Sequence, residues 1–324
     1  MPELPEVETI RRQLCVAGVE GRTIEKVHIE WPRTVEPLTP SAFSNQVKGH
    51  RLEKIDRHGK WLIFILGRDR SPNGPPVLSG VKERTARRSV PTNTNLLVHL
   101  RMTGGFYLTH GALKKGVHDR AILQLSGGLN LHFRDPRKFG RWRLESDIVG
   151  QASLYPESLC SSHKPENTRS RIREARPTIE GLGPDALTVA KKEFFQSLDG
   201  QNKVLKALLL DQSFVAGVGN IYADEALFEA RLDPRRKSGT LLEDEISKLW
   251  KAVRRVIEAG VRNGGTSLGD GQGNYVDLNG DAGGHREKVK VYGRAGQPCV
   301  VCGQPLHKTQ ITQRTTVFCA HCQK

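Results

Sequence analysis

Four of the chain's six cysteines form two Cys-x-x-Cys pairs near its carboxyl end. Each pair turns two thiolates toward one point, and two pairs make the tetrahedral set of sulfur ligands that suits Zn²⁺. The pattern therefore predicts a zinc site whose ligands are Cys299, Cys302, Cys319 and Cys322. Because four thiolates leave no open coordination position, the metal is expected to be structural rather than catalytic. Two disulfides or a redox pair are the alternative interpretations.

The chain has 324 residues, and its 50 lysines and arginines exceed its 35 aspartates and glutamates to give a net charge of +15. Such an excess is typical of proteins that bind nucleic acid, although a merely basic enzyme would share it. The sequence has no run of about 18 apolar residues that could span a membrane. Its acidic start, MPELPEVE, does not resemble a secretory signal, so a cytoplasmic location is expected. In that reducing compartment, paired cysteines favour metal binding over disulfides.

Short apolar segments separated by turn residues fill residues 1–150 and predict a β-rich domain. A short helix is expected over 7–17, and the expected strands cover 24–29, 60–66, 95–100, 121–125 and 129–133. Gly127 and Gly128 predict a hairpin between the last two strands. Many short strands close together favour a sandwich or a barrel. Residues 68–94, rich in Pro, Gly, Ser and Arg, predict an exposed insertion that is either a solvated loop or a basic arm on DNA.

The pattern becomes helical after a polar segment at 151–178, which we interpret as a linker. Helices are expected around Phe194, with Thr188 as the cap, and over 204–210, 221–230 and 242–261. The last of these is amphipathic, with an apolar face made of Ile246, Leu249, Trp250, Val253 and Ile257. A helical domain is thus predicted over 179–284, followed by the zinc finger over 285–324. The Gly-rich segment 264–284 predicts a long loop, and loops of that length are often functional.

Between the two cysteine pairs we expect a hairpin that carries Lys308 and Arg314 and has a basic, hydroxyl-rich tip. A tip of this kind on a rigid zinc ribbon suits contact with phosphate, although zinc ribbons also bind protein. His307 and His321 could compete as zinc ligands, but the four thiolates already complete the set.

The second residue is a candidate nucleophile. Removal of Met1 would expose Pro2 as a secondary amine, and α-amino groups titrate far below the lysine side chain. Attack of this amine on an aldehydic sugar carbon gives a cationic iminium, which acts as an electron sink. The adjacent Glu3 could move the proton. Many chains begin with Met-Pro for no chemical reason, so these residues by themselves leave the role open.

Seven motifs occur in order along the chain: MPELPEVETIRR, HGKW, HLRMTG, DPRKFGRW, GVGNIYADEALF, VYGR and the terminal cysteine pairs. Together they closely resemble the bacterial formamidopyrimidine-DNA glycosylases. The sister group of endonuclease VIII-like enzymes usually has Gly at the position of Leu4, which favours the first group. The resemblance implies an α+β multidomain fold with an N-terminal β-sandwich, a helix–two-turn–helix domain and a C-terminal zinc finger. It also implies a monomer that holds damaged double-stranded DNA between its lobes.

The implied activity is the excision of oxidised purines such as 8-oxoguanine, followed by cleavage of the abasic site through β,δ-elimination. By resemblance, Pro2 attacks the sugar C1′ and Glu3 is the acid–base carboxylate. Lys60 matches the lysine assigned to β-elimination, and Arg314 matches the finger arginine assigned to δ-elimination, with phosphate binding as its alternative role. A DNA-binding protein without catalysis and an oxidised-pyrimidine glycosylase of the sister group are the competing functions.

The resemblance also assigns residues that contact DNA. Met102, Arg137 and Phe139 match residues that fill the space left by a flipped base, and their types suit a pliable filler, a flat cation and an aromatic wedge. By themselves, Met102 and Phe139 would be interpreted as core residues. Asn220 matches the turn that contacts DNA, and a glycine turn opening a helix is a phosphate site on general grounds. His118 and Lys206 match residues that contact the DNA backbone, and solvated surface is the alternative for both. The 264–284 segment corresponds to the loop that covers the lesion.

Overall fold

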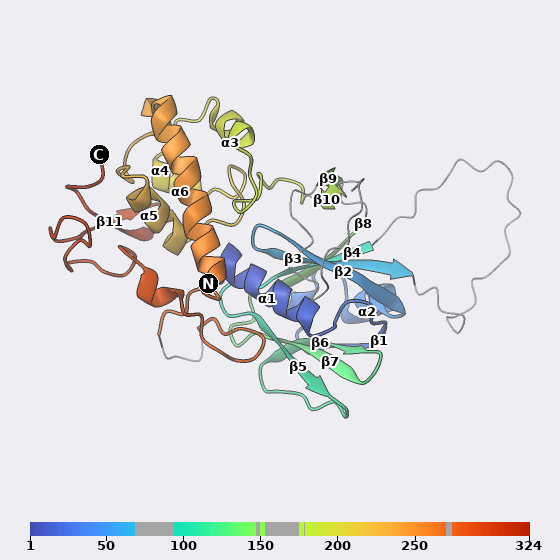
Figure 1. The fold of residues 1–324 in the computed structure, drawn as a ribbon. Coiled ribbons are helices and arrows are strands. Elements are labelled where there is room, and N and C mark those ends of the chain that lie inside the picture. The colour runs from blue at the N-terminus through green and yellow to red at the C-terminus, as the bar shows by residue number, and fades with distance from the viewer. Residues whose placement is uncertain (69–93, 147–149, 153–174, 178, 270–273) are drawn as a thin grey trace, which may run out of the picture. The chain divides into compact units, whose positions relative to one another are not determined.

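A computed structural model describes residues 1–68, 94–146, 150–152, 175–177, 179–269 and 274–324 (Figure 1). The chain divides into two units. The sandwich unit comprises Arg11–Asp56 and Leu62–Val149, and the helical unit comprises Met1–Ile10, Arg57–Trp61 and Gly150–Lys324. The first residues of the chain and a short turn thus belong with the helical unit. Residues 69–93 of the predicted insertion and nearly all of the predicted linker lie outside the described residues, and the predicted domain boundaries stay predictions.

The described part of the sandwich unit contains two four-stranded sheets, with strand orders β1-β6-β7-β5 and β2-β3-β4-β8. The strands are β1 (Ile24–Ile29), β2 (His50–His58), β3 (Trp61–Arg68), β4 (Thr94–His99), β5 (Gly105–His110), β6 (Asp119–Leu125), β7 (Leu129–Arg134) and β8 (Arg141–Ser146). Helix α2 (Pro40–Val47) and the short 3₁₀ helix η1 (Pro32–Thr34) lie in the connections. β6 and β7 pair antiparallel with Leu125 opposite Leu129, which confirms the hairpin predicted at Gly127 and Gly128.

Aromatic rings from both sheets meet in the core of the sandwich. Phe133 of β7 lies 5.5 Å from the ring of Trp142 on β8, and Phe106 of β5 lies 6.1 Å from the ring of Phe64 on β3. All four side chains are buried. Alternate residues of a strand face the same side of its sheet. Each sheet can therefore direct its apolar side chains toward the other sheet while its remaining side chains face outward. The sandwich expected from the sequence is therefore confirmed, although β2, β5, β8 and α2 had not been predicted.

The helical unit is organised around a long helix, α6 (Glu243–Arg262), which lies beside α5 (Asn220–Glu229) (Figure 1). Its other elements are the start of α1 (Leu4–Val16), the short pair β9 (Gly150–Ala152) and β10 (Ala175–Pro177), α3 (Lys191–Leu198), α4 (Leu205–Leu210), η3 (Ser238–Thr240) and η4 (His285–Lys288). Leu249, Val253 and Ile257 are buried in one cluster with residues of α4 and α5, as the predicted apolar face of α6 requires. In the described part of the chain, no helix is long and apolar enough to cross a membrane.

The predicted cap of α3 is wrong. The helix begins after Ala190 rather than after Thr188, and the Ala190 N–H donates to the Glu193 carboxylate at 3.0 Å. An acidic side chain in the first turn of a helix can satisfy a free N–H group as well as a hydroxyl cap can. The sequence carried that signal in Glu193, which is three residues after Ala190.

Helices α1, α5 and α6 approach closely at Gly260. A side chain there would place its first carbon 2.6 Å from the ring of Tyr222 and 2.8 Å from Pro5. The missing side chain thus lets the start of the chain pack against two helices that are far from it in sequence. Beyond α6, the described parts of the 264–284 segment contain isolated bridges rather than helices or longer strands.

The carboxyl end forms a two-stranded hairpin of β11 (His307–Ile311) and β12 (Arg314–Phe318), as expected between the cysteine pairs. Thr312 and Gln313 connect the strands with φ values of 48° and 59°. Two successive residues with positive φ match the right-handed twist of the flanking strands, which explains a tight turn at this point. The hairpin places Arg314 at the first position of β12.

Replacing Phe133 by Ala should destabilise the protein by about 3–5 kcal/mol, because it removes a buried ring at the contact between the two sheets. Urea unfolding of the purified variant measures the loss. Val16→Ala is the matched control, since this side chain is 81% exposed and its loss should change stability by no more than about 0.5 kcal/mol. Equal effects of the two substitutions would contradict the assigned core.

Candidate active site

The Glu3 carboxylate lies at the amino end of α5. Its two oxygens accept hydrogen bonds from the backbone N–H of Ile221 at 3.0 Å and of Tyr222 at 3.5 Å. The first N–H groups of a helix have no partner within the helix, and the helix dipole favours a negative charge there. Glu3 therefore caps a helix that begins more than two hundred residues later, and the cap fixes the position of the neighbouring Pro2.

Two glycines of the turn before α5 make this approach possible. A side chain on Gly219 would place its first carbon 2.2 Å from the Glu3 carboxyl carbon, and one on Gly217 would lie 2.4 Å from Leu4. Gly217 also has a φ of 110°, a conformation that L residues rarely adopt. The Leu4 N–H donates to the Gly217 carbonyl at 3.1 Å. The turn that suggested a phosphate site therefore binds a carboxylate of the chain itself through the N–H groups of Ile221 and Tyr222.

A second carboxylate, that of Glu6, is buried beside the first. It accepts hydrogen bonds from the Glu3 N–H at 2.7 Å, from the Thr266 N–H at 2.7 Å and from the Tyr222 hydroxyl at 2.9 Å. Burial, together with the neighbouring Glu3 charge, raises the pKa of Glu6 to about 7. Glu6 thus joins the start of the chain to α5 and to the beginning of the 264–284 loop.

Lys60 lies in the turn between β2 and β3, which buried ionic contacts hold in place. The Gly59 N–H donates to Asp185 at 2.7 Å, and Arg57 donates to the Gly59 carbonyl at 3.1 Å. Arg57 also pairs with Asp185 and, at 3.0 Å, with Glu8. Burial alone would raise the pKa of Asp185, but the Arg57 guanidinium holds it below its usual range. Asp185 therefore stays charged and anchors the turn that presents Lys60.

Burial lowers the pKa of the Lys60 amine. The charges of Glu3 and Glu6 act against this shift, while the positive charge of Arg314 adds to it. Glu3, Glu6 and Arg314 are thus each close enough to Lys60 to affect its amine, and a larger share of Lys60 is a neutral amine than for a lysine in water. The structure brings together Glu3, Lys60 and Arg314, and Pro2 is covalently joined to Glu3.

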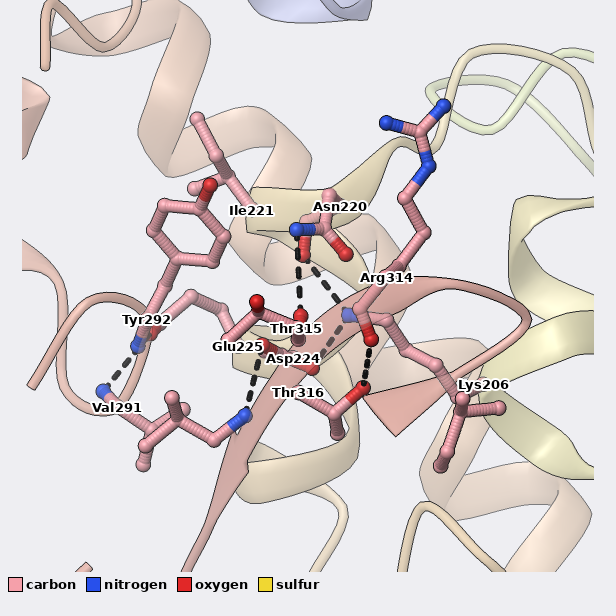
Figure 2. Close-up of polar contacts among 12 residues, drawn as sticks. Lys206, Asn220, Ile221, Asp224, Glu225, Val291, Tyr292, Arg314, Thr315 and Thr316 are labelled. Carbon is pink, nitrogen blue, oxygen red and sulfur yellow. Dashed lines mark hydrogen bonds and ion pairs between the residues drawn. The ribbon is translucent and has the colours of Figure 1, made fainter. Parts of the chain in front are cut away.

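Figure 2 shows how α4, α5 and the hairpin meet near Arg314. The Asn220 side chain donates to the Thr315 carbonyl at 3.3 Å, and the Arg314 side chain extends away from these contacts. Lys206 pairs with Asp224 and donates to the Asn220 carbonyl at 3.0 Å. Asn220 and Lys206, which the resemblance assigns to DNA contacts, therefore both form contacts within the protein.

Neither predicted role of Lys206 agrees with the structure. Its side chain is fully buried, so it is not solvated surface, and its ammonium faces Asp224 rather than an open side where a phosphate could lie. A buried lysine requires a partner of opposite charge, and Asp224 supplies it. We therefore remove Lys206 from the expected DNA-contacting residues. The contact between Asn220 and DNA stays a prediction.

In the sandwich unit, two loops carry the residues expected to enter DNA. The Thr103 hydroxyl donates to the Asp135 carboxylate at 2.5 Å, and the Arg137 N–H donates to the Thr103 hydroxyl at 3.3 Å. These contacts hold the loop of Met102 against the loop of Arg137 and Phe139. Phe139 is 46% exposed, so the alternative of a core residue is wrong for it.

Strained backbone accompanies these exposed side chains. Arg101, just before Met102, has a φ of 58°, and Lys138, between Arg137 and Phe139, has a φ of 62°. Non-glycine residues in this region are costly and are concentrated at functional sites. His118 is half-buried, and its carbonyl accepts a hydrogen bond from the Asp135 N–H at 2.9 Å. Its contact with DNA stays a prediction.

The four predicted zinc ligands converge. The Sγ atoms of Cys299, Cys302, Cys319 and Cys322 all lie within 4.8 Å of one another. Cys302 and Cys319 are 3.5 Å apart and Cys299 and Cys322 are 4.0 Å apart, too far for disulfides and close to the edge of a tetrahedron with Zn–S bonds of about 2.3 Å. The four cysteines are free thiols, which excludes the alternative of two disulfides. The donor set fits one structural zinc ion.

Several site residues had not been predicted: Glu6, Arg57, Asp185, Tyr222 and Asp224. Glu6 had a signal, since a glutamate three residues after Glu3 at the start of a helix is the second half of a capping box. Arg57 and Asp185 had none, because 128 residues separate them. Their pairing depends on the fold alone.

Family models match most of the chain. The Formamidopyrimidine-DNA glycosylase N-terminal domain matches residues 1–142, the Formamidopyrimidine-DNA glycosylase H2TH domain matches 181–271, and the zinc finger found in FPG and IleRS matches 296–324. A formamidopyrimidine-DNA glycosylase of Desulfitobacterium hafniense is 37% identical over the full length of both chains. The chain belongs to the formamidopyrimidine-DNA glycosylase family. The family match confirms the resemblance and identifies the chain as an enzyme of base-excision repair.

Other formamidopyrimidine-DNA glycosylases are similar to this chain in sequence and in structure. The Deinococcus radiodurans protein is 38% identical over all of this chain and 97% of its own length. The crystal structure of the MutM (Fpg) protein of Thermus thermophilus is 35% identical, with a TM-score of 0.71, and covers 99% of this chain and 98% of its own. Wild-type Lactococcus lactis Fpg, solved with DNA that contains N7-benzyl-Fapy-dG, is 28% identical over both full chains, with a TM-score of 0.74. The expected α+β multidomain fold is therefore confirmed.

The raised pKa of Glu6 makes stability depend on pH. The carboxyl ordinarily titrates near 4.5, and in the folded protein near 7, so between these values the unfolded chain loses its proton first. Stability should therefore fall as pH rises from 4.5 to 7, by an amount on the order of 3 kcal/mol from this group. Urea unfolding of wild type and Glu6→Gln across this range measures the effect. An identical pH dependence for both proteins would contradict the assignment.

Removal of zinc should disorder the hairpin that carries Arg314 and weaken binding to DNA, because a structural zinc site contributes directly to folding. Fluorescence anisotropy with a labelled duplex, before and after chelation, measures the loss. Binding should return when Zn²⁺ is added back, which controls for irreversible damage. Zinc-free protein that nicks DNA at the full rate would show that the finger is not needed.

Proposed function

We propose that this protein excises oxidised purines, including 8-oxoguanine and formamidopyrimidines, from double-stranded DNA and then cleaves the abasic site by β,δ-elimination. The observation that carries this proposal is the docking of Glu3 on the amino end of α5, which fixes the neighbouring Pro2 in the unit that also contains Lys60 and Arg314. The charges of Glu3 and Arg314 both act on the Lys60 amine. Relatives over the full length are named formamidopyrimidine-DNA glycosylase, and Lactococcus lactis Fpg has been solved with Fapy-dG-type DNA and with DNA that contains an abasic site.

The first step displaces the damaged base. After removal of Met1, the lone pair of the Pro2 nitrogen forms a bond to the sugar C1′, and the bond from C1′ to the base breaks with its electron pair leaving on the base. Glu3 takes the proton from the Pro2 nitrogen and passes it to the ring oxygen O4′ as the C1′–O4′ bond breaks. The product is an iminium that joins Pro2 to the opened sugar. Glu3 can serve because its position is fixed by Ile221 and Tyr222.

The next steps cut the strand. Loss of a proton from C2′ breaks the C3′–O3′ bond, and its electron pair leaves with the 3′ phosphate. Lys60 suits the removal of this proton because burial favours its neutral amine. Loss of the C4′ proton then breaks the C5′–O5′ bond, and the electron pair leaves with the second phosphate. Arg314 suits this departure as a cation beside the phosphate, since the planar guanidinium can donate two hydrogen bonds to phosphate oxygens.

Met102, Arg137 and Phe139 are proposed to occupy the space left when the lesion leaves the stack. A flipped base costs a few kcal/mol of stacking and pairing, which inserted side chains recover in part. The Thr103–Asp135 contact supports this role because it prearranges the two loops before DNA arrives. Asn220 and His118 are proposed to contact the DNA backbone, and the 264–284 loop is proposed to cover the lesion.

We also propose that the protein acts as a monomer, because Pro2, Glu3, Lys60 and Arg314 all belong to the helical unit of one chain. The cytoplasm, at the nucleoid, is the proposed location because the proposed substrate is chromosomal DNA. The zinc ion would stabilise the finger that carries Arg314, held by its four cysteines, and would supply no chemistry to the reaction.

Reduction with borohydride tests the proposed nucleophile. Mixing the protein with an 8-oxoguanine duplex and borohydride should give a covalent protein–DNA adduct, because reduction converts the iminium into a stable amine. Intact mass measurement establishes beforehand that Met1 is absent, and acetylation of the amino terminus should abolish the adduct. A duplex with thymine glycol tests the sister group's specificity and should react more slowly. An undiminished adduct after acetylation would rule out Pro2 as the nucleophile.

A further inference from the structure

The edge of the finger hairpin is held by side chains of α5. Asn220 donates to the Thr315 carbonyl at 3.3 Å, and the Val317 N–H donates to the Asp224 carboxylate at 3.2 Å (Figure 2). Asn220 and Asp224 are four residues apart and lie on the same face of the helix. Thr315 and Val317 are alternate residues, whose backbone groups point to the same edge of β12. The two contacts therefore fix where β12, which begins with Arg314, lies along α5.

Asp224 is itself held in place. Its other oxygen pairs with the ammonium of Lys206, and both side chains are almost completely buried. Burial raises the pKa of Asp224 to about 6 and lowers that of Lys206, while the attraction between the two opposes both shifts. Lys206 also donates to the Asn220 carbonyl, so one buried lysine supports both residues that contact the hairpin edge.

The neighbouring carboxylate has a different partner. Glu225 accepts hydrogen bonds from the backbone N–H groups of Lys290, Val291 and Tyr292 at 2.8–2.9 Å. These residues lie in the segment that enters the finger, not in the hairpin. Two adjacent acidic residues of α5 thus hold two different parts of the carboxyl-terminal segment, and only one of them contacts the strand of Arg314.

We propose that Asp224 is a positioning residue for the second elimination. By holding the Val317 N–H it sets the place of Arg314 beside the phosphate that leaves when the C5′–O5′ bond breaks, after the C4′ proton has been lost. Asp224 touches no substrate and acts through Arg314. This inference rests on the proposed role of Arg314. It predicts that loss of the Asp224–Val317 contact lowers δ-elimination while β-elimination, which depends on Pro2 and Lys60, continues.

Two double variants isolate this contact. Lys206→Met with Asp224→Leu removes the acceptor for the Val317 N–H, whereas Lys206→Met with Asp224→Asn keeps a side-chain oxygen that can accept it. Both remove the two charges together, which is often tolerated, since an uncharged buried pair leaves no unpaired ion. Both also lose the Lys206 contact with Asn220, so the pair differs chiefly in the acceptor. Glu225→Gln is a further control that leaves the hairpin edge untouched.

The measurement is the share of β,δ-product among all cleaved strands, from a labelled duplex that contains one abasic site. The Leu variant should lower this share by about tenfold, the order expected when a hydrogen bond to a charged group is lost. The Asn variant and Glu225→Gln should stay close to wild type. Because the readout is a ratio of products, a general loss of activity does not move it.

Equal product shares in the Leu and Asn variants would overturn the inference. Loss of zinc from both variants, measured as metal per chain, would also overturn it, because the contact would then be required for the fold of the finger rather than for the position of one side chain. If wild type cleaves the abasic duplex to neither the β-product nor the β,δ-product, the proposed lyase function fails instead. The two failures are therefore distinguishable.

Discussion

The contact on which the active site depends is that of the Glu3 carboxylate with the amino end of α5. The helix begins in a buried turn, where its free N–H groups need an acceptor that water does not supply. Glu3 supplies that acceptor, and in doing so it ties the second residue of the chain to a rigid element. A terminal residue would otherwise be among the most mobile parts of a protein. The cap of a helix is thus also the means by which a terminal nucleophile is held still.

Helix α5 connects the parts of the helical unit that carry chemistry. Its first turn holds Glu3, its Tyr222 hydroxyl contacts Glu6, and its Asp224 and Glu225 hold the finger hairpin and the segment before it. Each of these carboxylates is buried, and each accepts hydrogen bonds from backbone or side-chain donors. A buried polar group without a partner is costly. Each carboxylate must therefore keep its hydrogen bonds, which restricts it and its partners to one arrangement. The network thereby fixes relative positions that apolar packing would leave looser.

The same burial changes the acid–base properties of the site. Removal from water disfavours charge, which raises the pKa of Glu6 to about 7 and lowers the pKa of Lys60. A carboxyl group and an amine whose pKa values are shifted toward each other exchange protons more readily near neutral pH than the same groups in water. The proposed eliminations need removal of protons from carbon, and a neutral amine is the form of lysine that can accept one. The burial of these groups is therefore also the physical cause of their reactivity.

The features that the sequence determined are those written in local spacing. The zinc ligands follow from the two Cys-x-x-Cys pairs, the buried face of α6 from its helical period, and the β6–β7 hairpin from Gly127 and Gly128. Pro2 and Glu3 were recognised because the motif at the start of the chain is distinctive. In each case the residues that define the feature lie within a few turns or strands of one another, or belong to one motif.

Tertiary structure alone decided which charges meet. Lys206 was expected on the surface and is buried against Asp224, and Arg57 pairs with Asp185 across 128 residues. A charged side chain has the same local pattern whether water or a distant carboxylate surrounds it. Its partner is chosen by how the helices and turns pack, because only packing removes the water and brings the two groups together. The metal site and the candidate nucleophile are therefore visible in the sequence, while the residues that orient them become visible only in the fold.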